Sequence, residues 1–155
     1  MKLSLTVQHL ENDDHIPTDE QFSIWIKAAL KGYKKQAELV LRLTNKEESA
    51  ELNQFYRHKV GPTNILSFGA TLPPDFAKHN LQGDLVICVP LVREEAEADN
   101  IPLAAHWAHL VIHGCLHLLG YDHELDSEAE MMEKLEADIM IKLGFDNPYE
   151  EIQDE

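Results

Sequence analysis

The sequence contains little cysteine and has no long apolar run. Among 155 residues there are two cysteines, Cys88 and Cys115, and each lies inside an apolar segment, where a reduced cysteine behaves as a small hydrophobic residue. This pattern excludes a fold built on a disulfide framework. No apolar segment reaches the roughly 20 residues that span a bilayer, and residues 3–9 alternate apolar and polar side chains as a strand does. We therefore expect a cytoplasmic protein without a membrane partner.

Positive charge is also scarce. Lysine and arginine total 13 against 28 aspartates and glutamates, which gives a net charge of −15. Because nucleic-acid binding draws on cations that displace counterions from phosphates, this average argues against a nucleic-acid partner. Residues 27–59, however, contain eight Lys or Arg against four Glu, whereas residues 94–155 contain two Lys against seventeen acids. The simplest interpretation is one basic and one acidic solvated face, although the basic segment is able to bind a polyanion.

No repeat, linker or low-complexity segment divides the chain, and its length is sufficient for one core, so we expect one domain over residues 1–155. Strand patterns occur early and helical patterns dominate after residue 90. The order predicts an α+β fold, with a single layer of helices on a small mixed four-stranded sheet. The expected strands are residues 3–9, 38–44, 64–68 and 84–89, and the late helices are residues 91–98, 102–119 and 127–143.

Two earlier helices show N-terminal capping patterns. Thr18 and Gln21 have the spacing of a capping box, and Thr44 with Glu47 repeats it before a helix that continues to about residue 56. We expect the first helix to bury an aromatic and aliphatic stripe. The inner face of the second is expected to carry Leu52, Phe55 and Tyr56.

The densest chemical signal is a group of five histidines within residues 106–123. On a helix, His113 and His117 lie about 40° apart and one turn along, so both imidazoles can reach one metal ion. Gly120 permits the left-handed turn that ends the helix, which lets His123 arrive as a third ligand. Three neutral imidazoles leave one tetrahedral position open, as in catalytic zinc sites. The sequence therefore predicts a metal site on a helix of the C-terminal half and the turn that follows it.

The alternative for this segment is a histidine-rich buried helix that binds no metal. His106 and His109 are interpreted as packing or supporting residues. Zinc is the expected metal, although three histidines and water also suit nickel, copper or iron.

The ligand spacing matches that of the metzincin peptidases, including the turn glycine, with one difference. Where those enzymes carry the glutamate that acts as general base, this chain has Gly114, so peptidase activity is not expected. A replacement base would come from elsewhere, with Asp122 and Asp84 as candidates. For Asp122 we favour a turn residue or a supporting partner that orients His123, whereas Asp84 is equally suited to be an ordinary carboxylate at the mouth of a strand.

The sequence resembles the YbeY family of bacterial endoribonucleases. The resemblance is carried by His113–His123, by Tyr56–Arg57 followed by Pro62–Phe68, and by Gly83–Cys88, in the family's order. Two departures are Val60, where the family commonly has Asp, and Gly69, where Pro is frequent.

The resemblance implies zinc on the three histidines and a functionally important Arg57. It also implies a zinc-dependent, single-strand-specific endoribonuclease that acts in 3′-end maturation of small-subunit (16S) ribosomal RNA and in ribosome quality control. Its partners would be ribosomal RNA, the small subunit and its assembly factors, and not DNA. A guanidinium suits phosphate oxygens by its own chemistry, and Lys59, Lys31, Lys34 and Lys35 would extend a track for the RNA backbone.

Two other functions stay open at this point. One is a ribosome-associated metal-binding factor without nuclease activity, which a fourth protein ligand on the metal would favour. The other is a metallohydrolase for a small molecule or peptide, which would require a closed pocket.

Overall fold

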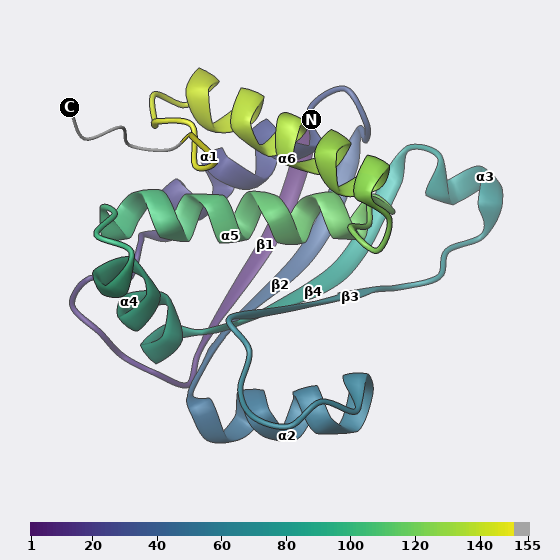
Figure 1. The fold of residues 1–155 in the computed structure, drawn as a ribbon. Helices are drawn as coiled ribbons and strands as arrows, with labels where there is room; N and C mark the ends of the chain where they lie inside the picture. Colours follow the sequence, from purple (N-terminus) through teal and green to yellow (C-terminus); the bar gives the residue numbers. More distant parts are fainter. Residues whose placement is uncertain (151–155) are drawn as a thin grey trace.

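A computed structural model describes residues 1–150 of the chain, and its centre is a four-stranded sheet (Figure 1). The order across the sheet is β1-β2-β4-β3, with β1, β2 and β4 parallel and β3 antiparallel to β4. The α+β class and the small mixed sheet are thereby confirmed. Three strands begin earlier than expected, by one residue in β1, two in β2 and four in β4. The strands are β1 (Lys2–His9), β2 (Gln36–Thr44), β3 (Ile65–Gly69) and β4 (Asn80–Cys88).

Six helices are described around this sheet, and α5 lies across its face with α1 and α6 beside it (Figure 1). None of the helices within residues 1–150 has both the length and the apolar character that a bilayer crossing requires. The helices are α1 (Asp19–Leu30), α2 (Lys46–Arg57), α3 (Pro74–Ala77), α4 (Val89–Ala98), α5 (Leu103–Leu118) and α6 (Asp126–Lys142).

The core forms where the inward faces of β2 and β4 meet α1 and α5. Alternate residues of β2, such as Leu39 and Leu41, are fully buried, as the period of two in a strand requires. From α1, Phe22 contacts Trp107 of α5 edge to face, with ring centroids 5.7 Å apart. Each such buried side chain stabilises the fold by about 1.5–3 kcal/mol. This packing fixes α5, which carries the histidines, rigidly against the sheet.

Helix α2 lies on the opposite side of the sheet from α5 (Figure 1), so one helix lies outside the single layer that we expected. The reason lies in β4, where successive side chains point to opposite faces of the sheet. Leu85 and Ile87 are buried on the α5 side, and Val86 and Cys88, which alternate with them, are buried as well. A strand that is apolar on both faces requires cover on both.

The expected cap of α2 is wrong, and so are two of the three residues expected on its inner face, since Leu52 alone is half-buried. Thr44 is the buried last residue of β2, and the N-cap is Asn45, whose side chain accepts a hydrogen bond from the backbone N–H of Glu48 at 2.9 Å. Phe55 is 73% exposed and Tyr56 is 54% exposed.

The inner face of α2 is polar because it packs on a loop. Ser49 donates from its hydroxyl to the carbonyl of Thr63 at 2.8 Å, and the Asn53 side chain donates to the carbonyl of Gly61 at 2.9 Å. These bonds hold the residues between α2 and β3 in place. Helical spacing of large side chains does not by itself distinguish an inner face from an outer one.

Candidate metal centre

The predicted histidines meet at one point. Helix α5 places His113 and His117 one turn apart, and the turn through Gly120, with φ at +104°, returns the chain so that His123 joins them. Each of the three offers a ring nitrogen, and these nitrogens all lie within 4.8 Å of one another. The cluster can therefore hold a metal ion.

The hydrogen bonds of the two helical histidines determine which ring nitrogens are left available for a metal ion. His113 Nδ1 contacts a carboxylate oxygen of Glu136, and His117 Nδ1 lies 2.9 Å from the carbonyl oxygen of Tyr121. Both partners accept only, so each Nδ1 donates, and in the neutral ring each Nε2 keeps its lone pair.

Those two Nε2 atoms face each other at 3.0 Å. Two lone pairs at this separation repel unless a cation lies between them, and two nitrogens on one tetrahedral zinc are about 3.3 Å apart. The donor set and its arrangement thus fit a divalent ion with affinity for imidazole.

Glu136 of α6 is the supporting residue that the sequence analysis missed. Its side chain is 1% exposed and contacts His113, the Nε2 of His109 at 3.4 Å and the hydroxyl of Tyr149. Burial opposes its ionisation, but hydrogen bonds from His109 and His113 outweigh burial and lower the pKa of Glu136 to about 2. A carboxylate in this position fixes the tautomer and orientation of a histidine ligand.

A sequence signal for this residue did exist. Glu136 lies one turn from Met132 and one turn from Met140, and both methionines are buried. An acid in the middle of the apolar stripe of a helix is stable only if it finds a buried partner. His109, which we interpreted as a packing or supporting residue, contacts this carboxylate.

Gly114 explains why the peptidase glutamate is absent. A Cβ at this position would lie 2.7 Å from Ile65 Cδ1 and 2.8 Å from Leu85 Cδ2, where α5 packs on β3 and β4. The residue after the first ligand therefore points into the core and away from the metal. No side chain of any length at this position can act as a base.

The third ligand and its neighbour lie closer to solvent. The side chain of His123 is 60% exposed. Its backbone N–H donates to Asp122 Oδ1 at 2.7 Å, while its Nδ1 is 3.7 Å from the same oxygen, beyond hydrogen-bonding distance. Asp122 thus shapes the turn that carries His123. Burial, followed by the charges of His113 and His123, lowers the pKa of His117, which favours the neutral imidazole that metal binding requires.

Asp84 lies on the other face of the sheet. It pairs across the β3–β4 ladder with Phe68. Leu85, the next residue of β4, points to the opposite face of the sheet, where α5 packs on it at Gly114. Of the two carboxylates considered as a base, Asp122 is the one that lines the cavity at the histidines.

A cavity of about 560 Å³ opens at the histidines, and residues from distant parts of the chain line it. Two basic residues line it as well: Arg57, the last residue of α2, and Lys59, which follows α2 in the chain. The structure thus brings the expected arginine to the expected metal ligands. Other lining residues include Asn53, Asn64, Ser67, Gly69, Tyr121 and Glu124.

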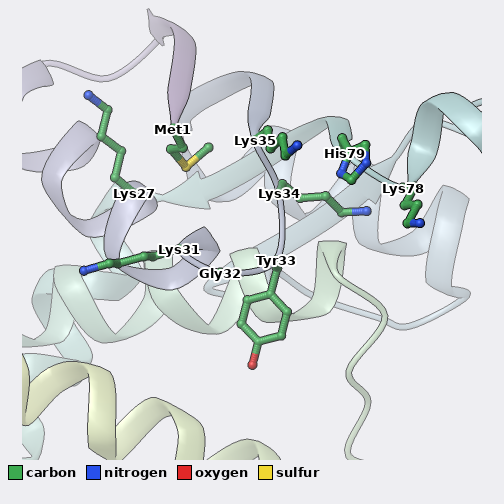
Figure 2. A pocket seen from close by; sticks show the side chains of 9 residues that line it. All are labelled: Met1, Lys27, Lys31, Gly32, Tyr33, Lys34, Lys35, Lys78 and His79. Carbon is green, nitrogen blue, oxygen red and sulfur yellow. The ribbon is translucent and has the colours of Figure 1, made fainter.

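The remaining predicted lysines lie in a second pocket. Lys31, Lys34 and Lys35 line a separate pocket of about 790 Å³ together with Lys27 and Lys78 (Figure 2). The lysines that we expected to form one track with Lys59 are therefore divided between two pockets.

Comparison with known proteins yields two findings. A family model described as Endoribonuclease YbeY matches residues 7–144. The chain is also similar to the solution structure of TM1509 from Thermotoga maritima, at 22% sequence identity and a TM-score of 0.58, and the match covers 96% of this chain and 99% of that one. The second finding supports the fold alone.

Proposed function

The chain belongs to the YbeY family of endoribonucleases, and from that premise we propose that it is a zinc-dependent enzyme that cleaves single-stranded ribosomal RNA. We propose that one hydrolase domain carries this activity. Its biological reaction would be 3′-end maturation of the small-subunit (16S) RNA, with a part in ribosome quality control and contacts to the subunit and its assembly factors. Nickel or another divalent metal is the alternative to zinc.

The observation that carries the proposal is the meeting of a three-histidine cluster with Arg57 in one cavity. A divalent ion bound there would supply Lewis acidity toward a phosphoryl oxygen and would lower the pKa of bound water. His113, His117 and His123 would hold the ion. The guanidinium of Arg57 would bind the non-bridging oxygens of the scissile phosphate and stabilise the charge that develops on them.

The same cavity weighs against the other two functions. Within residues 1–150 the cluster consists of three histidines, and no fourth protein ligand joins it, whereas a purely structural zinc site has four. A small-molecule hydrolase would enclose its metal, but His123 has most of its side chain in solvent. Both features suit a long substrate that enters the site from the surface.

The proposal is tested by cleavage of a single-stranded ribosomal RNA fragment, with bound metal counted by mass spectrometry in each preparation. The wild type is compared with His117→Ala, Arg57→Ala and a control, Lys142→Ala, which removes an exposed cation from the last turn of α6. We expect cleavage by the wild type and the control, loss of metal in His117→Ala, and metal without turnover in Arg57→Ala.

Two results would count against the proposal. Equal cleavage by all four preparations would indicate a contaminating nuclease and favour the metal-binding factor. Equal loss of metal from both active-site variants would remove the separate role assigned to Arg57. The metal that copurifies with the wild type identifies the ion.

A further inference from the structure

The second pocket gathers positive charge in a strongly acidic protein. It is lined by Lys27, Lys31, Lys34, Lys35 and Lys78 with His79, and no aspartate or glutamate lines it (Figure 2). Within residues 1–150, none of these five lysines forms a salt bridge to a carboxylate. Five ammonium groups without acidic partners repel one another, and an anion relieves that repulsion.

The fold holds these lysines together through the backbone. β2 and β4 are parallel, so both begin at the same edge of the sheet, and the segments that precede them are hydrogen-bonded. The N–H of Lys35 donates to the carbonyl of His79 at 2.9 Å, and the ammonium of Lys34 donates to the carbonyl of Ala77. Lys31 follows directly on α1, before the turn at Gly32. The pocket is thus a fixed feature of the fold.

Two tyrosines connect this pocket to the metal cavity. Tyr33 lines the lysine pocket and Tyr121 lines the cavity at the histidines. Their rings meet edge to face with centroids 6.2 Å apart, and their hydroxyls are 3.3 Å apart. The carbonyl of Tyr121 also holds His117 Nδ1. One pair of side chains therefore separates the lysine pocket from a metal ligand.

We propose that the lysine pocket is a second RNA subsite, which binds backbone phosphates of the same single strand whose scissile phosphate lies at the histidines. This inference rests on the proposed function. Charge complementarity and the position of the pocket next to the cavity, across the Tyr33–Tyr121 contact, identify the occupant as the substrate strand. Ammonium groups act as point charges without the planar geometry of a guanidinium, so the subsite binds the backbone irrespective of base sequence.

The test measures affinity for a single-stranded RNA dodecamer as a function of salt, by fluorescence anisotropy, with the RNA checked for integrity after each titration. The variant is Lys31→Gln/Lys35→Gln, because both side chains are exposed and neither makes a side-chain hydrogen bond in the described structure. The matched control is Lys134→Gln/Lys142→Gln on α6, which removes the same charge from exposed positions.

The expected result is specific to the first pair. Each phosphate contact on a single strand contributes about −0.7 to the slope of log K against log salt, so losing two contacts makes the negative slope shallower by about 1.4. At 0.1 M salt this corresponds to a loss of affinity of about 25-fold. The control should retain the wild-type slope, and Lys31→Arg/Lys35→Arg should restore it. Equal slopes for both glutamine variants would overturn the subsite.

The subsite and the proposed function fail in different ways. If the wild type cleaves RNA but the two glutamine variants bind it alike, the nuclease assignment stands and the subsite is wrong. If the wild type binds RNA through the lysines but does not cleave it, the subsite stands and the proposed activity is wrong.

Discussion

The metal centre and the lysine pocket lie on either side of the Tyr33–Tyr121 pair, yet they are built in different ways. In the metal centre, both helical histidines have a hydrogen-bond partner that fixes the ring, and one partner, Glu136, is itself buried and hydrogen-bonded. In the lysine pocket, Lys34 makes a hydrogen bond with its ammonium and the charges otherwise face open space. The first site depends on the positions of atoms and the second on the number of charges.

This contrast determines how each site responds to substitution. A ligand site loses function when a ring moves by about 1 Å, because the tetrahedral arrangement permits little error. A cluster of exposed ammoniums loses affinity in small, nearly equal steps and is screened by salt. The predictions below test whether the two regions differ in this way.

The largest effect is expected for His113→Ala. It removes one of three metal ligands and leaves the Glu136 carboxylate without one of its partners, so we expect loss of bound metal and at least a roughly thousandfold loss of RNA cleavage. Metal content and turnover are measured on the same preparation. Lys31→Ala is the comparison, with an expected loss of roughly fivefold in RNA affinity. Similar losses in both variants would remove the distinction.

A smaller effect is expected when the support of a ligand is changed and the ligand is kept. Glu136→Gln preserves the shape of the side chain but removes the charge that fixes the His113 ring, and metal affinity should fall by about 10–100-fold. Competition with a chelator measures the affinity. Glu133→Gln is the control, because that side chain is exposed on the same helix. Unchanged affinity in Glu136→Gln would show that the histidines need no outer partner.

The next effect concerns folding. Gly114→Ala forces Ile65 and Leu85 to move, and we expect it to lower the free energy of unfolding by about 1–3 kcal/mol, less about 1 kcal/mol that alanine returns through helix propensity. Gly32→Ala at the lysine pocket meets no atom within 4 Å and is strained only by its φ of +86°. Denaturant unfolding compares the two. Loss of metal in Gly114→Ala but not in Gly32→Ala would tie the packing of α5 to the site.

How far the sequence could predict these two regions follows from the same contrast. The clustering of the three histidines was predictable because they lie within eleven residues along the chain. The helical period of 3.6 residues places two of them on one face, and one glycine ends the helix before the third. The α+β class and most element positions follow from apolar periodicity. Local rules were sufficient for both.

Contacts between residues far apart in the sequence could not be predicted in the same way. Glu136 of α6 meets His113 of α5, and Arg57 reaches the cavity from α2. The apolar stripe around Glu136 indicates a buried partner, but which partner it meets depends on packing that no local pattern encodes. The lysines at 31, 34 and 35 were expected to continue from Lys59, yet the backbone pairing of β2 with β4 gathers them with Lys78. The prediction for the inner face of α2 failed because a loop, rather than the sheet, supplies the partners of that face.

The smallest expected effect is the most informative about the lysine pocket. Lys31→Arg keeps the charge and changes the shape of the donor, so RNA affinity and its salt slope should stay within about twofold of the wild type. Arg57→Lys makes the reverse exchange at the metal cavity, where a bidentate guanidinium is proposed to bind the scissile phosphate, and turnover should fall by about tenfold or more at unchanged metal content. If Arg57 acted through its charge alone, neither exchange would change affinity or turnover. Both regions would then recognise RNA by charge alone.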